Sequence, residues 1–213
     1  MKNIKIILGL STLLLLQACG KSEETGATGR VTTTAAAPSP AASCATDAAM
    51  KVGRVYDDTN GAVTPSFNDQ LKNFISGFDN PSAIEYVSGL YNDNTRVELT
   101  GALKFDTKGN ILAQQSQIRM SVYDSRSVYS GSPPFSMVFS TAQGMAITGT
   151  YNASNKYIDV QFSDALGTLT IAAVYDGTFV SGSLYFNNKK SHDGSAGKSG
   201  RLGGFYINGC SIL

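Results

Sequence analysis

The chain has 213 residues, of which 42% are hydrophobic, and its 17 basic side chains nearly balance its 16 acidic ones. This balance argues against a nucleic-acid partner, which calls for a strongly basic surface. The single histidine also excludes metal sites built from several histidines.

The first segment of the chain is predicted to direct export. Lys2 and Lys5 precede an apolar run of about eleven residues that ends at Leu16, whereas a membrane-spanning helix needs roughly 20. A positive start followed by a short apolar run and small residues is typical of a secretory signal.

The residues that end this run, Leu16, Gln17, Ala18 and Cys19, resemble the lipobox of bacterial lipoproteins, with Gln17 as a less usual second residue. The resemblance covers only about the first 20 residues. It implies cleavage before Cys19, a diacylglycerol thioether on its sulfur and an acyl chain, such as palmitate, on its amine. Because Gly20 and Lys21 follow instead of Asp, it also implies sorting to the outer membrane, facing the periplasm or the exterior. The alternative is a secreted protein cut elsewhere, with Cys19 incidental.

The resemblance divides the chain into a signal peptide over 1–18, a lipidated tether over 19–43 and a domain over 44–213. Loss of Lys2 and Lys5 leaves 15 basic against 16 acidic residues, a net charge of −1. Residues 20–43 are rich in Gly, Ser, Thr, Ala and Pro, and such a segment buries too little apolar surface to fold. As a coil it would span about 27 Å on average.

One segment of the domain has a helical pattern. Phe67, Leu71, Phe74, Ile75 and Phe78 share one face at helical spacing, which predicts a short amphipathic helix near 66–77. Ser66 is suited to cap its start, with Asp69 near the positive helix end, and Gly77 is suited to its exit. This aromatic stripe is interpreted as a core-facing surface.

The rest of the domain alternates apolar and polar residues between turn-forming breaks, which predicts about eight strands. Few helical signals and many short strands indicate an all-β, antiparallel β-sandwich, with a jelly roll as the preferred topology. The predicted strands lie in the stretches RVELTGALKFD, NILAQQSQIRMSVYD, PFSMVFS, GMAITGTYN, KYIDVQFSD, GTLTIAAVYD, TFVSGSLYFNN and RLGGFYING.

A Val-Tyr-Asp sequence occurs three times, at unequal spacings that do not make a repeat array. Two interpretations are open. In the first, each Tyr packs on the sheet and each Asp opens a turn by bonding the backbone ahead of it. In the second, the three corners gather at one end of the fold as a binding site, which requires the three strands to run in the same direction. The candidate binding residues are Tyr56, Asp57, Tyr123, Asp124, Tyr175 and Asp176.

Other motifs give weaker indications. Asp58, Asn60 and Gly61 have a calcium-loop-like spacing but lack the distal Glu, so a tight turn is predicted, with a structural Ca²⁺ as a weak option. The stretch HDGSAGKSG has the Gly-Lys-Ser of a phosphate loop without its first glycine, so no nucleotide site and no cofactor are predicted. It is read as a hairpin loop whose basic side chains would be solvated or touch envelope phosphates and carboxylates: Lys189, Lys190, Lys198 and Arg201.

The remaining cysteines, Cys44 and Cys210, lie near the two ends of the domain. Disulfides persist in the oxidising compartments that an exported protein reaches, so a Cys44–Cys210 bridge is predicted; free thiols and metal ligands are the alternatives. The chain-entropy model assigns about 4–5 kcal/mol to such a long closed loop.

These features lead to one functional prediction. The protein is expected to be an outer-membrane-anchored lipoprotein, held in the bilayer by acylated Cys19, whose sandwich binds a protein or glycan of the cell envelope. A catalytic role is less favoured because the sequence has no Gly-x-Ser-x-Gly elbow and no acidic pair marked by its neighbours. The alternatives are a glycan-active hydrolase that uses aspartates and a structural spacer without a ligand.

Overall fold

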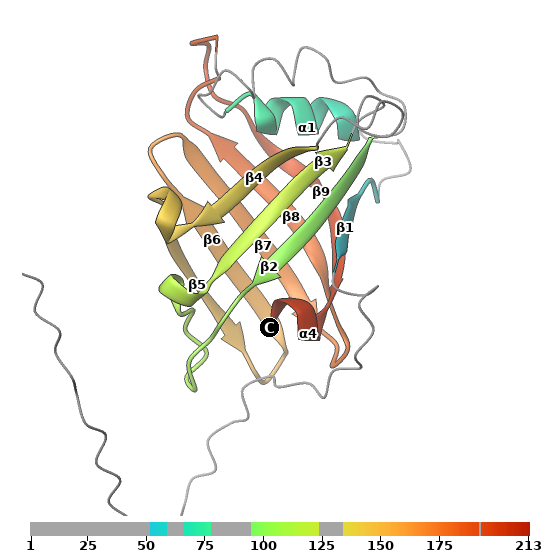
Figure 1. The fold of residues 1–213 in the computed structure, drawn as a ribbon, viewed down its shortest axis with the longest axis vertical. Helices are drawn as coiled ribbons and strands as arrows, with labels where there is room; N and C mark the ends of the chain where they lie inside the picture. The colour runs from blue at the N-terminus through green and yellow to red at the C-terminus, as the bar shows by residue number, and fades with distance from the viewer. Residues whose placement is uncertain (1–51, 59–65, 78–94, 124–133, 192) are drawn as a thin grey trace, which may run out of the picture. The chain divides into compact units, whose positions relative to one another are not determined.

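The computed structural model describes residues 52–58, 66–77, 95–123, 134–191 and 193–213, and the signal peptide, the tether and Cys44 lie outside these ranges. The described residues form one antiparallel sheet of nine strands with two α-helices and two 3₁₀ turns (Figure 1). The strands are β1 Gly53–Tyr56, β2 Arg96–Ala102, β3 Gln117–Tyr123, β4 Phe135–Ser140, β5 Ala146–Asn152, β6 Tyr157–Ser163, β7 Gly167–Tyr175, β8 Phe179–Asn188 and β9 Ser199–Asn208. The helices are α1 Phe67–Ile75 and α4 Gly209–Ile212, and the 3₁₀ turns are η2 Ala113–Gln115 and η3 Thr141–Gln143.

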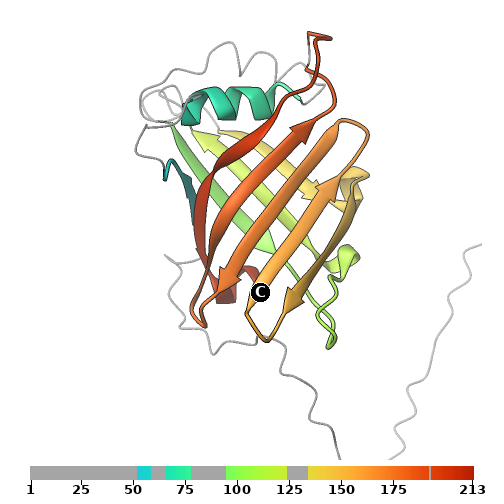
Figure 2. The same cartoon turned by 180° about the vertical axis from the view of Figure 1, so that it is seen from behind.

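The sheet is made of two meanders, β1–β4 and β5–β9, joined where β1 pairs with β9. It curves until the half with β2, β3 and β4 faces the half with β6, β7 and β8, as the two opposite views show (Figures 1 and 2). The result is a nearly closed, barrel-like sheet. Near the open side, the loop between β2 and β3 bonds the free edge of β5, where Tyr151 N donates to Gly109 O at 2.7 Å and Ile111 N donates to Gly149 O at 3.1 Å.

The all-β, antiparallel prediction is confirmed, and each of the eight predicted strands is present. The ninth strand is the short β1. The preferred jelly-roll topology is wrong, because every strand except β1 and β9 pairs only with its neighbours in sequence. The physical reason lies in the connections: the links between β5 and β6, β6 and β7, and β7 and β8 are tight turns, and such turns force consecutive strands to pair.

The core lies between the facing halves of the sheet. Side chains alternate along the strands, so that Ile158, Val160 and Phe162 of β6 point inward and are fully buried. The rings of Phe139 and Phe162 meet edge to face across the interior, with centroids 6.1 Å apart. This packing fills the interior with side chains.

Helix α1 covers one end of the curved sheet (Figures 1 and 2). Its start is as predicted, since the Ser66 side chain accepts a hydrogen bond from Asp69 N at 3.3 Å. Its buried face inserts Phe74 between two strands, with ring centroids 6.1 Å from Phe139 and 5.6 Å from Phe186. The core-facing interpretation of the stripe is therefore confirmed for the described residues; Phe78 lies outside them.

The opposite end of the sheet is covered by α4, which follows β9 directly (Figure 1). The Asn208 side chain caps this helix by accepting from Cys210 N at 2.9 Å, and Ile212 is fully buried. Among the described residues, no helix is long and apolar enough to span a membrane.

Candidate functional site

The three Val-Tyr-Asp corners do not gather at one end of the sheet. β1 and β3 both run antiparallel to β2 and so run in the same direction. Three antiparallel pairings, β1 with β9, β9 with β8 and β8 with β7, make β7 run the opposite way. Tyr56 and Tyr123 therefore lie toward the α1 end and Tyr175 at the α4 end, so the three-corner binding site is not formed.

Tyr175 and Asp176 have structural roles that match the first interpretation. Tyr175 is only 6% exposed, and its hydroxyl donates to Gly177 O at 2.8 Å. The Asp176 carboxylate accepts from Thr178 N and Phe179 N, both at 2.7 Å. These backbone bonds hold the pKa of Asp176 below its usual value. This corner is a packed turn.

Tyr56 belongs to a different cluster, on the outer face of β1, β9 and β8. Three tyrosines there are strongly exposed: Tyr56 at 41%, Tyr185 at 41% and Tyr206 at 46%. The rings of Tyr56 and Tyr206 lie 5.9 Å apart, tilted by 55°. We call this surface the tyrosine face and define it by six residues: Tyr56, Asp58, Ser183, Tyr185, Arg201 and Tyr206.

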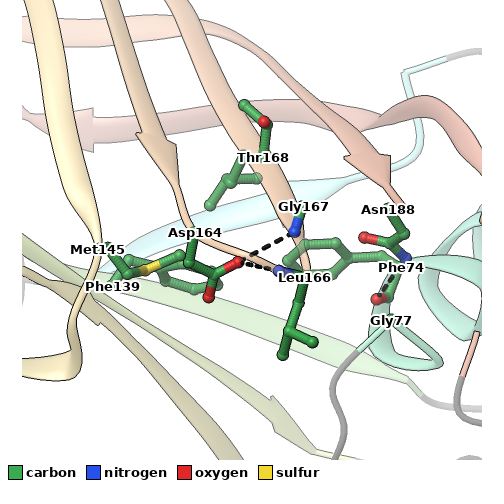
Figure 3. Close-up of a pocket in the computed structure, with 10 residues that line it drawn as sticks. Phe74, Gly77, Phe139, Met145, Asp164, Leu166, Gly167, Thr168 and Asn188 are labelled. Atoms are coloured by element: carbon green, nitrogen blue, oxygen red, sulfur yellow. Dashed lines mark hydrogen bonds between the residues drawn. The ribbon is translucent and has the colours of Figure 1, made fainter. Parts of the chain in front are cut away.

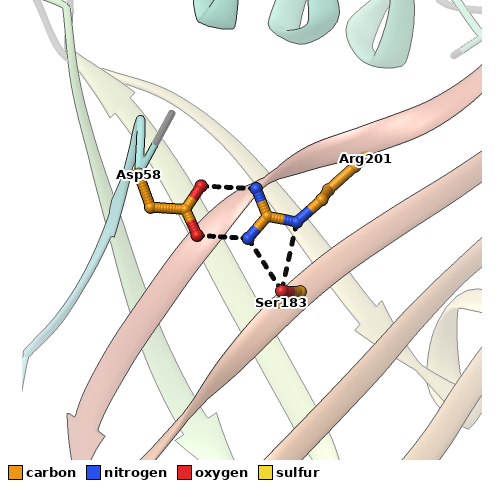
Figure 4. Close-up of polar contacts among 3 residues, drawn as sticks. All are labelled: Asp58, Ser183 and Arg201. Atoms are coloured by element: carbon orange, nitrogen blue, oxygen red, sulfur yellow. Dashed lines mark hydrogen bonds and ion pairs between the residues drawn. The ribbon is translucent and has the colours of Figure 1, made fainter. Parts of the chain in front are cut away.

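The polar centre of the tyrosine face is an ion pair. The Arg201 guanidinium binds both carboxylate oxygens of Asp58 (Figure 4). It also donates to the Ser183 hydroxyl, from Nε at 3.2 Å and from Nη2 at 2.8 Å. The hydrogen bond from Arg201 lowers the pKa of Asp58, and the same contact raises the pKa of Arg201. The pair is therefore ionised on both sides at neutral pH.

A β-bulge in β9 places Arg201 on this face. Leu184 pairs with Gly203, but the next residue of β8, Tyr185, pairs with Arg201, so Leu202 is an extra residue in β9. Without that extra residue, Arg201 would face the core. With it, Leu202 is buried at 1% exposure while Arg201 points outward. Bulges re-aim side chains in this way and are common beside functional sites.

Gly204 gives Tyr56 and Asp58 room to lie against the sheet. Gly204 pairs with Tyr56 in β1 and with Ser183 in β8, at the middle of the face. A Cβ at Gly204 would be 2.9 Å from Asp58 Oδ2 and 3.1 Å from Tyr56 Cζ. The space that a side chain at position 204 would occupy is thus filled by the ring of Tyr56, at the end of β1, and by the carboxylate of Asp58, two residues later.

Charged residues of β1 and β2 border the tyrosine face. Glu98 binds Arg54 at 3.1 Å and Arg96 at 3.3 Å, and Arg54 is the direct cross-strand neighbour of Tyr206. Arg96 also stacks on Tyr123, with Cζ 4.4 Å from the ring centroid. Tyr56 and Tyr123 therefore lie on the same outer surface of the sheet, linked by the charged residues between them. Asp57 follows β1 and is half-buried, whereas Asp124 lies outside the described residues.

A second candidate is a hollow at the α1 end of the sheet, lined by side chains such as Phe74, Met145, Leu166 and Asn188 (Figure 3). Its one carboxylate, Asp164, accepts from Leu166 N at 2.8 Å and Gly167 N at 2.9 Å, so it stabilises a turn. The cavity volume is about 20 Å³. That is room for about one water molecule, far less than an organic ligand needs. The hollow is a packing gap beneath the helix.

Three of the four basic side chains for which solvation or contact with envelope groups was expected, Lys189, Lys198 and Arg201, have contacts within the chain. Lys198 Nζ donates to Asn73 Oδ1 at 3.0 Å and Lys189 Nζ donates to Asp164 O at 3.2 Å.

The structure also gives no support to a metal site at the calcium-like sequence. Asp58 is bound to Arg201, while the other residues of this sequence, Asn60 and Gly61, lie outside the described residues. In the part of the chain that the structure describes, no cluster of three or more His, Cys, Asp or Glu could hold a metal ion.

Comparison of the chain with protein-family models, with curated proteins and with solved structures found no match. The candidate site therefore depends on its geometry alone.

The sequence pointed to only part of this site. Tyr56 was among the predicted binding residues, but Tyr185, Tyr206 and Ser183 were missed, and Arg201 was grouped with the loop lysines. One available signal was the alternation in SGSLYFNN, which turns Tyr185 outward between buried Leu184 and Phe186. The Gly-Gly step after Leu202 was another, since glycine within a strand often marks a bulge.

Proposed function

We propose that this protein is a lipid-anchored binding module of the bacterial cell envelope and that the tyrosine face is its contact surface. The observation that supports the binding role is the placement of three exposed tyrosines around one bidentate Asp58–Arg201 pair on a rigid sheet. Tyr and Arg are enriched where proteins bind partners, because each combines a large contact area with hydrogen-bonding groups. Sites carried by strands are also held more firmly than sites carried by loops.

A hydrolase is the less favoured alternative. Glycoside hydrolysis needs two carboxyl groups facing each other across a substrate, one of them an acid whose pKa is raised. The acidic groups in and beside the tyrosine face have other partners: Asp58 is bound to Arg201, and Glu98 lies between Arg54 and Arg96. Where the described carboxylates have a shifted pKa, at Asp58, Asp106 and Asp176, the shift is downward. These contacts favour binding over acid catalysis.

The anchor rests on the lipobox-like sequence. Acylated Cys19 would hold the protein in the outer membrane, and residues 20–43 would give the domain reach. Three acyl chains exceed the two signals that stable anchoring requires. Labelling with a radioactive fatty acid tests the anchor: the wild-type chain should be labelled and Cys19→Ala should not. Persistent labelling of Cys19→Ala would refute it.

Site-specific photocrosslinking tests the contact surface in intact cells. A benzophenone amino acid at position 206 of the full chain should capture an envelope component. The same probe at Thr148, which is exposed on the outer side of β5, should capture far less. A benzophenone inserts into C–H bonds of proteins, glycans and lipids alike, so the result does not depend on the ligand class. Equal capture at both positions would show that the tyrosine face is not the contact surface.

A further inference from the structure

We infer that the ligand of the tyrosine face is an uncharged, hydroxyl-rich glycan chain. This inference rests on the proposed binding role and adds the chemical class of the ligand. It is carried by the charge balance of the face, the groups that it exposes and the spacing of its rings.

The charge balance favours a neutral ligand. The two ionised groups of the tyrosine face, Asp58 and Arg201, are bound to each other through two parallel hydrogen bonds. In a bidentate pair of this kind, two N–H groups of the guanidinium donate to the two carboxylate oxygens. At this centre, an anion would have to displace the Asp58 carboxylate from Arg201, and a cation would have to compete with Arg201 for Asp58. The arginines that border the face, Arg54 and Arg96, both bind Glu98. A neutral ligand binds without breaking the pair.

The exposed polar groups match those of a sugar. Each carboxylate oxygen of Asp58 has a further acceptor site, and each tyrosine hydroxyl both donates and accepts. Sugar hydroxyls need donors and acceptors in comparable number, and the face presents both around one centre. The Ser183 hydroxyl, which accepts from Arg201, adds a further donor at that centre.

The rings provide the complementary apolar contact. An aromatic face carries partial negative charge, and the C–H bonds on one side of a sugar ring carry partial positive charge, so the two stack favourably. Tyr206 is the most exposed large apolar residue of the described part of the chain, at 46%, so its ring is the one expected to make such a contact.

The spacing indicates a chain rather than a single sugar. Tyr206 lies opposite Ser181, four residues along β8 from Tyr185. At a rise of about 3.3 Å per residue, the two tyrosines are separated by roughly 13 Å along the strands. The positions between them are Ser183, which Arg201 binds, and Gly204, which Tyr56 and Asp58 cover, so a ligand that reaches both tyrosines would pass over the Asp58–Arg201 pair. A protein partner would be expected to bury an apolar centre, whereas the centre of this face is an ion pair that also binds the Ser183 hydroxyl.

The test uses the full chain, purified in detergent, and an array of defined oligosaccharides. The neutral probes are hexamers of glucose, mannose and N-acetylglucosamine, each with its monosaccharide, and the anionic probes are hexamers of glucuronate and of sulfated glucose. We expect at least one neutral hexamer to bind more tightly than its monosaccharide, with an affinity that changes little as salt rises, because uncharged ligands are not screened.

Variants separate the tyrosine face from the rest of the surface. Tyr206→Ala should weaken binding of the neutral hexamer about tenfold, as expected for loss of a stacked ring. Tyr157→Ala is the matched control, since Tyr157 is 40% exposed on β6 and lies outside the face. Tyr206→Phe keeps the ring and should retain most of the affinity. This second variant therefore tests the role of the ring even if Tyr206→Ala does not fold. Equal losses for Tyr206→Ala and Tyr157→Ala would overturn the inference.

The remaining outcomes distinguish this inference from the proposed function. Binding to anionic hexamers alone, or to no hexamer, overturns the glycan inference. If position 206 nevertheless captures a protein in cells more strongly than Thr148 does, the binding role stands and its ligand is a protein. If position 206 captures nothing more than Thr148 does, the proposed function fails, and the glycan inference fails with it.

Discussion

Tyr56 lies over Gly204, with its Cζ atom 3.1 Å from the place that a Cβ of residue 204 would occupy. Asp58 approaches the same position from β1, with Oδ2 at 2.9 Å. The absence of a side chain at Gly204 in β9 thus leaves room for Tyr56 and for Asp58, the residue that binds Arg201. The tyrosine face depends on this contact.

Gly204→Ala is expected to push Tyr56 and Asp58 away from the sheet. Because the displaced atoms are the ends of flexible side chains, the free energy of unfolding should fall by only about 1 kcal/mol, at the low end for an overpacked site. Urea unfolding measures this change, and Ser181→Ala, at an exposed position of β8, is the control. A Gly204→Ala protein as stable as Ser181→Ala would show that the contact is loose.

The Asp58–Arg201 pair is expected to make stability depend on acid. The hydrogen bond from Arg201 holds the folded pKa of Asp58 below its usual value. The stabilisation is therefore present above about pH 4 and is lost as the pH falls through the folded pKa. Asp58→Asn should cost about 0.5–1 kcal/mol at pH 7, the range for a partly exposed pair. This difference from wild type should shrink toward zero near pH 2 in urea titrations.

Arg201→Lys is the matched control for that experiment. It keeps the charge but loses the two-pronged geometry, so most of the acid dependence should remain while some stability is lost. A difference between Asp58→Asn and wild type that stays constant from pH 7 to pH 2 would contradict an ionised pair.

Asn188 is expected to hold α1 against the end of the sheet. Its Nδ2 donates to Asn73 O at 2.8 Å and to Phe74 O at 3.1 Å, and the residue is 8% exposed (Figure 3). Asn188→Ala removes both donors from carbonyls near the helix end, which should cost about 1–3 kcal/mol. Hydrogen exchange of the α1 amides should accelerate as well. Asn187→Ala, at the exposed neighbouring position, should change stability by less than about 0.5 kcal/mol, and equal effects of the two variants would argue against the contact.

Tyr175 is expected to stabilise the fold without binding the ligand. Tyr175→Phe removes the hydrogen bond to Gly177 O and should lower the free energy of unfolding by about 1 kcal/mol. Ligand capture at position 206 should be unchanged. Reduced capture together with unchanged stability would restore Tyr175 as a binding residue.

The Cys44–Cys210 bridge remains a prediction. Cys210 lies in α4, at the α4 end of the sheet, and a bridge would tie the start of the domain to this end. Alkylation of the unfolded protein without reductant should leave both cysteines unmodified, and mass spectrometry of the peptides reads the result. Modification of either cysteine before reduction would rule the bridge out.

The local structure of the domain could be predicted from its sequence with good fidelity. Ser66 caps α1 as expected, and Leu71, Phe74 and Ile75 face the core because helical spacing places them on one side. The strands also lie where alternation and turn residues put them. These features depend on interactions between residues close in sequence, which is why a pattern can reveal them.

The candidate site could be predicted only in part. Identical Val-Tyr-Asp sequences have different roles. Tyr56 is exposed beside Tyr206, whereas Tyr175 is buried beside a turn. The two corners also lie at opposite ends of the sheet, because β1 runs opposite to β7. Whether two strands run in the same direction depends on how many antiparallel pairings separate them in the sheet. This number is a property of the whole sheet, so the sequence around one strand does not reveal it.

By itself, the sequence determined the all-β class of the domain, the start and buried face of α1 and the positions of eight strands, because turn chemistry and side-chain periodicity act over a few residues. Only the tertiary structure decided that Asp58 meets Arg201, which is 143 positions away in the chain. That contact needs β1 to pair with β9, a bulge to turn Arg201 outward and a glycine to leave space between them. Each condition joins residues that are distant in sequence, so only the closing of the sheet brings them together.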